Sequence, residues 1–277
     1  MATGGAAPDP IPPVGDPPVC VHNRAFAPGV LLALSGAGDD LLQAVTPNEL
    51  TIAWKNGTHF YVSDWDGDAE VFGAPLEVAG GAAYSSVALS PDGLVLVGIK
   101  SDLTVVEQTR GVGEAFDDAN PDAGDFEEFN ASLATVPLAN QVLADAVVGA
   151  DETSFFFSHF SSTYSGSYAS VFESHRSGGV WGFASADLGK LLYGSDQKRC
   201  IPTGVSSDSL TLFYFDQIKD EVRAAWRVNP QVQFDYSEAF DLGTGATAAV
   251  PSGGCARIYY SAQGANDLDL FVSQVTP

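Results

Sequence analysis

The chain has 277 residues, of which 35 are acidic and 12 are basic, so its formal net charge at pH 7 is −23. Such a charge repels phosphate groups, which excludes a general nucleic-acid binder and disfavours an anionic membrane surface as the partner. No apolar run reaches the roughly 18–20 residues that a membrane-spanning helix requires. We therefore expect no transmembrane segment, and we attribute the excess of acid to solubility.

The first 20 residues, Met1 to Cys20, are rich in Ala, Gly and Pro and contain few apolar side chains. This composition predicts a disordered leader over residues 1–20, followed by a single domain over residues 21–277. No charged-then-apolar signal segment is visible. A Pro/Gly-rich tether before a β-rich domain is nevertheless common in exported bacterial proteins. We expect an exported protein, whether periplasmic, cell-surface or secreted, with a tethered lipoprotein as one form.

A polar tight turn recurs five times, each time just before an apolar or aromatic run. Successive turns are 44, 59, 57 and 45 residues apart, near the length of a four-stranded propeller blade. We therefore predict an all-β fold, a five-bladed β-propeller of four-stranded antiparallel blades, in which each turn joins the innermost strand to the second. The third residues of the five turns are Asn48, Asp92, Asp151, Asp208 and Gly253.

The last repeat stops just after its third strand, which we place at Asp269–Val275. Near the other end of the chain, Phe26–Leu31 has the aromatic, small and aliphatic pattern of an outermost strand. We predict that this N-terminal strand completes the fifth blade. Such closure leaves no open sheet edge between the first and last blades.

Three repeats end their third strand on an arginine: Arg110, Arg176 and Arg227. An arginine at one repeat position usually packs over a neighbouring blade or pairs with an acid there. We expect a structural role for all three.

Two segments carry a family resemblance: Leu89–Leu96, with the sequence Leu-Ser-Pro-Asp-Gly-Leu-Val-Leu, and Asp267–Val272. In them the chain resembles the TolB-type propeller repeats of bacterial envelope and secreted proteins. As a pattern, the resemblance extends over Phe26–Val275. It departs from the family at Pro47–Glu49, where Pro-Asp-Gly is usual, and in the count of five blades, since TolB-type rings often have six. The resemblance implies a fold and does not imply a reaction.

Three cysteines leave one outside any single disulfide. In the predicted topology Cys20 and Cys255 lie on the same face of the fifth blade, while Cys200 begins a strand at the opposite face. A Cys20–Cys255 bond would hold the closing strand if the protein is exported to an oxidising compartment. The alternative is three reduced, buried thiols.

The segment Asp64-Trp65-Asp66-Gly67-Asp68-Ala69-Glu70 holds four carboxylates in seven residues. Asp64, Asp66, Asp68 and Glu70 could surround one calcium ion, although the full calcium-loop pattern is absent. The segment also reads as an ordinary polar hairpin with Asp-Gly in the turn. We expect weak calcium binding at most and no other cofactor.

Catalytic motifs are not recognisable: the chain has no Gly-x-Ser-x-Gly elbow, phosphate loop or dinucleotide fingerprint. Five-bladed propellers include carbohydrate-active enzymes with carboxylates around the central funnel. Asp102, Asp216 and Glu221 lie at or near hairpins that would surround this axial mouth, and Tyr164 is a further candidate there. The aromatic residues that could stack on sugar rings are Trp54, Tyr84, Tyr164 and Tyr214.

The regular repeat without a catalytic constellation predicts a non-enzymatic binding or scaffolding module. Its ligand, a protein or a glycan, would bind at the axial mouth of a monomer. The alternative is a carbohydrate-active hydrolase that uses carboxylates at the central funnel. Two or three acids facing one pocket at roughly 5–10 Å would favour the hydrolase.

Overall fold

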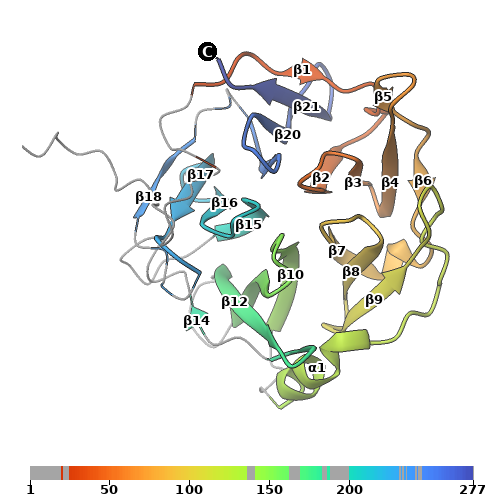
Figure 1. The fold of residues 1–277 in the computed structure, drawn as a ribbon, viewed down its shortest axis with the longest axis vertical. Helices are drawn as coiled ribbons and strands as arrows, with labels where there is room; N and C mark the ends of the chain where they lie inside the picture. The colour runs from red at the N-terminus through yellow and green to blue at the C-terminus, as the bar shows by residue number, and fades with distance from the viewer. Residues whose placement is uncertain are drawn as a thin grey trace, which may run out of the picture.

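The computed structural model describes residues 20, 25–135, 141–161, 169–182, 186–187, 200–230, 232, 234, 236–240, 242 and 245–276. Over this part of the chain, five antiparallel sheets surround a central axis (Figure 1). The fold is therefore a five-bladed β-propeller, as the spacing of the turns predicts.

The innermost strand of each blade runs along the axis and contacts the innermost strands of both neighbouring blades. In four of the five, the register with the second strand is interrupted by a β-bulge, whose extra residue is left out of the strand pairing. The innermost strands are β2 (Asp40–Val45), β7 (Tyr84–Leu89), β10 (Gln141–Val148), β15 (Cys200–Val205) and β19 (Ala248–Pro251).

The second and third strands form a hairpin in every blade. The second strands are buried along most of their length and read as apolar runs, whereas the third strands carry more polar residues and are partly exposed. The hairpins are β3–β4 (Thr51–Asn56, His59–Asp66), β8–β9 (Val95–Lys100, Val105–Thr109), β11–β12 (Ser154–Ser161, Ala169–Ser177), β16–β17 (Thr211–Asp216, Glu221–Trp226) and β20–β21 (Arg257–Gln263, Leu268–Gln274).

The five recurring turns all join an innermost strand to a second strand, as predicted. In each, the last turn residue has a positive φ, between 48° and 74°. Where the third position is Asn or Asp, its side chain accepts a hydrogen bond from the backbone N–H two residues on, which favours this turn. The five positive-φ residues are Glu49, Gly93, Glu152, Ser209 and Cys255.

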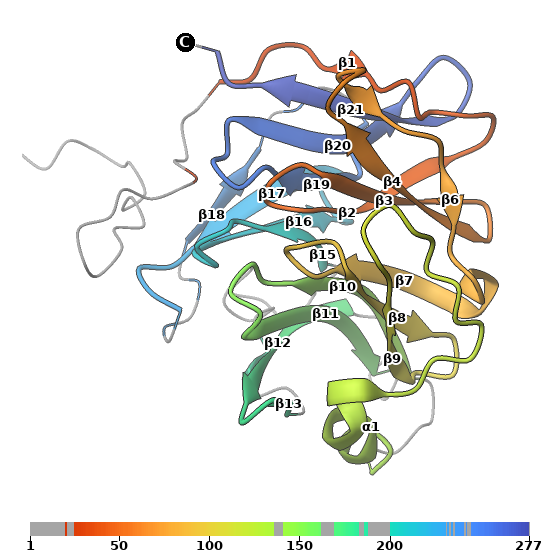
Figure 2. The same ribbon diagram turned by 45° about the vertical axis from the view of Figure 1, so that its right-hand side comes forward.

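The outermost strands are short: β5 (Val71–Phe72), β6 (Leu76–Glu77), β13 (Val180–Trp181), β14 (Ala186–Asp187) and β18 (Tyr236–Ala239). The second blade departs from the expected four strands, because its sheet contains only β7, β8 and β9 in the described residues. Helix α1 (Glu127–Leu133) and the 3-10 turn η2 (Gly124–Phe126) lie beside β9 at the rim (Figure 2). A second 3-10 turn, η1 (Gly81–Ala83), precedes β7.

The N-terminal strand β1 (Val30–Leu31) completes the fifth blade by pairing with β21. Val30 lies opposite Val272, and a further bridge joins Phe26 to Val275. The strand order β1-β21-β20-β19 confirms the predicted closure of the ring by the two ends of the chain.

Five apolar clusters fill the five interfaces between adjacent blades. At the interface of blades two and three, Phe126, Phe129 and Leu133 of the helical segment pack against Phe155 and Phe157. Each of these five side chains is at most 3% exposed. Burial of one such side chain stabilises a fold by about 1.5–3 kcal/mol, so the helical segment supplies an apolar cover beside a sheet that has no outer strand in the described residues.

Hydrogen bonds from side chains join the blades near the axis. At every one of the five interfaces, a polar side chain of one blade reaches the innermost-strand backbone of the next, where buried N–H and C=O groups need partners. In ring order the pairs are Gln43–Val87 (3.2 Å), Ser85–Leu143 (3.4 Å), Ser158–Cys200 (3.4 Å), Thr203–Ala249 (2.9 Å) and Ser261–Leu42 (2.6 Å).

The three strand-end arginines pair with acids that precede them in the ring, in agreement with their expected structural role. Arg110 contacts Asp64 of blade one at 2.6 Å. Arg227 contacts Glu173 of blade three at 2.9 Å, and both side chains are almost completely buried. The third pair joins Arg176 to Asp125 beside helix α1.

Cys20 and Cys255 form a disulfide, with their Cα atoms 5.1 Å apart. Cys255 is the positive-φ residue of the turn in blade five, so the bond attaches the N-terminal segment to the blade that β1 completes. Cys200 is buried and lies outside this bond.

Removal of residues 1–34 deletes β1 and Cys20 together. Because the entropic model gives a disulfide across so long a loop about 5 kcal/mol, we expect the melting temperature to fall by about 10 °C or more. Thermal unfolding of the truncated and full chains measures this. Removal of residues 1–19 alone is the control and should leave the melting temperature within about 2 °C. An unchanged melting temperature in the longer truncation would contradict the closure.

Peptide mapping without reducing agent should recover one bonded pair, Cys20 with Cys255, from protein made in an oxidising compartment. Cys200 should be alkylated after unfolding without reduction. Recovery of three alkylated cysteines under the same conditions would show that the bond does not form in solution.

Candidate functional site

The axis of the ring widens into a cavity of about 220 Å³ at the face that carries the hairpins between second and third strands. Gln217 and Leu268 lie at two of these hairpins, while Thr247 precedes an innermost strand. Leu41 and Ile201 contribute from the first residues of β2 and β15. This is the axial mouth at which the sequence predicts a ligand.

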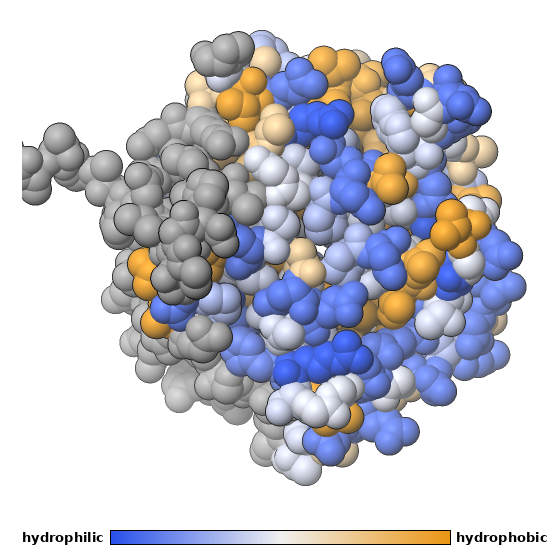
Figure 3. Space-filling view, in the orientation of Figure 1, coloured by the Kyte–Doolittle hydropathy of each residue, from blue (hydrophilic) through white to orange (hydrophobic). Residues whose placement is uncertain are grey.

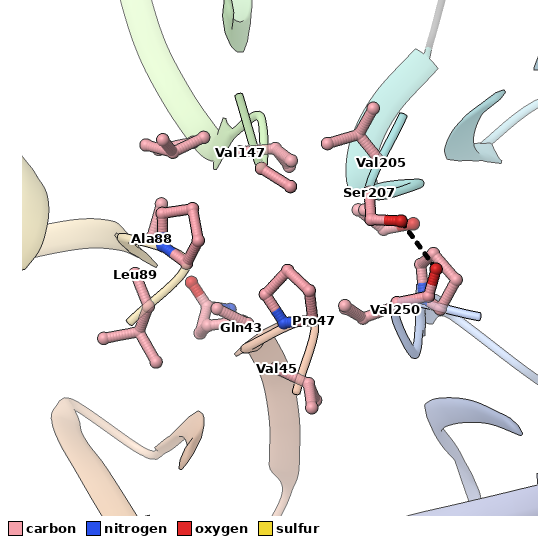
Figure 4. Close-up of a pocket in the computed structure, with 18 residues that line it drawn as sticks. Gln43, Val45, Pro47, Ala88, Leu89, Val147, Val205, Ser207 and Val250 are labelled. Carbon is pink, nitrogen blue, oxygen red and sulfur yellow. Dashed lines mark hydrogen bonds between the residues drawn. The ribbon is translucent and has the colours of Figure 1, made fainter. Parts of the chain in front are cut away.

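At the opposite face the axis is narrow. Side chains from all five blades converge there, among them Val147, Val205 and Val250 (Figure 4), and leave a space of about 30 Å³. Gln43 and Thr203 line both this space and the wider cavity. The axis is therefore a funnel, and a ligand larger than water enters it from the wide end.

Asp145 is the carboxylate that lines the wide cavity in the described part of the chain. It lies in the bulge of β10, where the register skips from Ala144 to Val147, and its φ is 57°. Burial raises the pKa of Asp145 to about 6, against the opposing effects of a hydrogen bond from Ser158 and the positive charge of Lys55. A carboxyl group with a strained backbone and a raised pKa in a cavity is typical of a functional site.

The other polar groups of the cavity differ in how far they are already engaged. Gln43 accepts a hydrogen bond from the Val87 N–H at 3.2 Å, and Thr203 donates to Ala249 at 2.9 Å. The hydroxyl oxygen of Thr247 is buried and has no hydrogen-bond partner in the structure. Gln217 also lines the cavity and is exposed, so Asp145, Thr247 and Gln217 are the polar residues best able to meet a ligand.

The three acids predicted at the mouth are not among the residues that line the cavity. Asp102 accepts a hydrogen bond from the Thr104 N–H at 3.0 Å, which lowers the pKa of Asp102. Glu221 pairs with Arg223 at 2.5 Å. Asp216 is fully buried and accepts backbone hydrogen bonds within its own hairpin, at 2.9 and 3.1 Å. Each of these acids stabilises a hairpin at the mouth, and a binding role for them stays a prediction.

The aromatic residues predicted to stack on sugars are core residues where the structure describes them. Trp54, Tyr84 and Tyr214 are 2%, 4% and 0% exposed. Tyr164 lies outside the described residues. Phe215 is the single aromatic residue in the described lining of the cavity. The described lining therefore has no pair of rings that could hold a sugar between them.

The acidic segment over Asp64–Glu70 forms the hairpin between β4 and β5. The carboxylate of Asp64 is already bonded within the protein, since it accepts a hydrogen bond from Thr51 at 2.7 Å and one from Arg110 at 2.6 Å. Asp66 accepts a hydrogen bond from the Asp68 N–H at 2.9 Å, as in an ordinary turn. Among the described residues, no group of three or more His, Cys, Asp or Glu side chains is placed to hold a metal ion. Calcium binding here remains a prediction.

No family model matches this chain, and no curated protein matches its sequence. The solved structures that it resembles include a putative TolB from Agrobacterium tumefaciens, with 12% identity, 92% of this chain and 78% of that one covered, and a TM-score of 0.46. Another is TolB from Acinetobacter baumannii, with 10% identity, 93% and 56% covered, and a TM-score of 0.41. A third is a gluconolactonase from Xanthomonas campestris, with 13% identity, 92% and 99% covered, and a TM-score of 0.48.

All three TM-scores are below 0.5, so these likenesses carry no argument about function. The five-bladed fold rests on the strand pairing of the chain itself. The propeller architecture expected from the TolB-type resemblance is present, while membership of that repeat family stays a prediction.

The described surface is mostly hydrophilic on the face shown in Figure 3. A helix long and apolar enough to cross a membrane is not found in the described ranges.

Replacing Asp145 by Asn should change how stability depends on pH. The pKa of Asp145 is raised when the chain is folded, so the folded chain keeps a proton that the unfolded chain loses between about pH 4 and 6. Asp145 therefore destabilises the fold increasingly as pH rises through this window. We expect Asp145→Asn to melt near the parent at pH 4 and about 3 °C or more above it at pH 7. Asn also tolerates a positive φ.

The control is Asp92→Asn, whose effect on stability should depend on pH in the opposite direction. A hydrogen bond from Ser90 lowers the pKa of Asp92 in the folded chain, so this carboxylate stabilises at neutral pH and its effect is lost in acid. A difference between Asp145→Asn and the parent that does not change with pH would contradict a raised pKa at Asp145.

Calorimetric titration of calcium into chelator-treated protein should give a dissociation constant in the sub-millimolar range or weaker. Arg110 already neutralises Asp64, and the remaining carboxylates of the hairpin are solvated. Micromolar binding that is abolished by Asp66→Asn would overturn this expectation.

Proposed function

We propose that this protein is a non-enzymatic, exported propeller that binds a protein or glycan partner at the wide axial mouth. The observation that supports this most is the cavity of about 220 Å³ at the face formed by the hairpins and the inter-blade connections. Propellers present ligands at such mouths because the loops of all blades converge there.

The carboxylates favour binding over glycoside hydrolysis. A hydrolase of this type needs two acids that face one pocket, about 5–10 Å apart. Asp145 is the single carboxylate in the described lining of the cavity. Asp216 and Glu221 are engaged in their own hairpin instead. The raised pKa of Asp145 suits a general acid, so the hydrolase remains the second candidate.

Export is supported by the Cys20–Cys255 disulfide, since such bonds persist in oxidising compartments and are rare in the bacterial cytosol. The net charge of −23 bears on the choice of partner, because it attracts basic surfaces toward the protein.

The test is to screen one sample on a glycan array, with a displayed peptide library and in a glycan-hydrolysis assay. We expect a selected binder without turnover, and at least tenfold weaker binding by Gln217→Trp, which fills the mouth. Ile218→Trp is the matched control, because Ile218 is the exposed neighbour in the same hairpin and does not line the cavity. Turnover abolished by Asp145→Asn, or binding unaffected by Gln217→Trp, would contradict the proposal.

A further inference from the structure

The cavity at the axial mouth has the size of one side chain. Its volume is about 220 Å³, below the roughly 300–1,000 Å³ of pockets that hold drug-sized ligands. Most of its wall is apolar, and includes Leu41, Ile201, Pro202 and Phe215. Such a wall suits an alkyl chain better than a sugar, which would need several hydrogen-bonding groups at fixed positions.

Two residues with side-chain oxygens line this apolar space from different blades. Asp145 belongs to the third blade, and Thr247 leads into the innermost strand of the fifth. The Thr247 hydroxyl is buried without a hydrogen-bond partner, an arrangement that destabilises a fold unless a ligand or water meets it. Asp145 is the one charged residue of the described lining, so the lining holds no cation that pairs with it.

The chain's own nearby cation, Lys55, is not among the residues that line the cavity. The Lys55 ammonium lies over the Phe60 ring, 5.3 Å from its centroid, and acts on Asp145 through its charge. A cation that pairs with Asp145 in the cavity must therefore come from another molecule. The net charge of −23 attracts such a cation to the protein.

We propose that the axial cavity receives the side chain of a lysine from a protein partner, with its alkyl chain against the apolar wall and its ammonium group at Asp145 and Thr247. This rests on the proposed function, since it names the partner group that enters the mouth. Lysine combines an apolar stem with a compact charged end that has three donors. The guanidinium of arginine also pairs with a carboxylate, but its planar charged end is bulkier than an ammonium group, so the experiment compares the two.

The experiment titrates n-butylammonium chloride, a fragment with the shape of the lysine side chain, into the full-length ¹⁵N-labelled protein. Amide shifts report where it binds. We expect saturable shifts at Ala146, Thr203 and Thr247, which line the cavity, with a dissociation constant in the millimolar range. n-Butanol, of the same shape without charge, should bind at least tenfold more weakly, and n-butylguanidinium several-fold more weakly.

Two variants test the acceptors separately. Asp145→Asn should weaken n-butylammonium binding at least tenfold, and Thr247→Val several-fold, while the shape of the site is kept. Asp151→Asn is the matched control: it makes the same charge change in the same blade, at the turn on the opposite face, and should bind as the parent does. Equal binding of n-butanol, no loss in Asp145→Asn, or shifts spread over the outer surface would overturn the proposal.

The outcome is distinguishable from failure of the proposed function. A binder from the screen that is lost in Gln217→Trp but insensitive to Asp145→Asn would uphold binding at the mouth and sink the lysine assignment. Binding of n-butylammonium in the cavity, with no binder found at the mouth, would uphold the chemistry of the site and sink the proposed function.

Discussion

The structure depends on closing the ring. Each blade buries both faces against its neighbours, so a blade with one neighbour missing would expose an apolar cluster to water. Blades five and one meet where β1 of blade five continues into β2 of blade one, and polar contacts are dense there. Glu49 accepts a hydrogen bond from Tyr259 and pairs with Arg257, each at 2.7 Å. The strand β1 and the disulfide complete the same blade.

The bulged innermost strands explain why so few polar groups remain for a ligand. Bulges turn Gln43, Ser85 and Thr203 toward the next blade, where their side chains bond backbone groups across the interface. Asp145 occupies a bulge as well, and this residue lines the cavity. The bulge residue joins neighbouring blades in three of the innermost strands, whereas in the third blade it places a polar residue at the axis.

Much of the fold follows from local signals in the sequence. The turns and the closing strand are encoded by residue types within a few positions of each other, such as Asp92 before Gly93, so pattern alone predicts them. Helix α1 was not predicted, because its segment also carries many acids. Its apolar residues Phe126, Phe129 and Leu133 have helical spacing, and that signal could have found it.

The candidate site was harder to predict. The position of Asp216 at a hairpin predicts a binding residue at the mouth, yet the same position lets its carboxylate accept hydrogen bonds from its own turn. Asp145 gives no such signal, since only the bulge and the neighbouring blades determine which way a residue in Gln141–Val148 faces. Pairs that span the ring, such as Arg110 with Asp64, likewise require the assembled structure.

The pairing of β1 with β21 also orders events during synthesis. Val30 and Leu31 are synthesised long before their partners Val272 and Phe271, so they stay unpaired until β21 has left the ribosome. Contacts of such long sequence separation form slowly, because the loop between them must close first. Until then the fifth sheet has a vacant edge that the same segment of another chain can fill. Crowded nascent chains can therefore exchange this strand and form domain-swapped dimers.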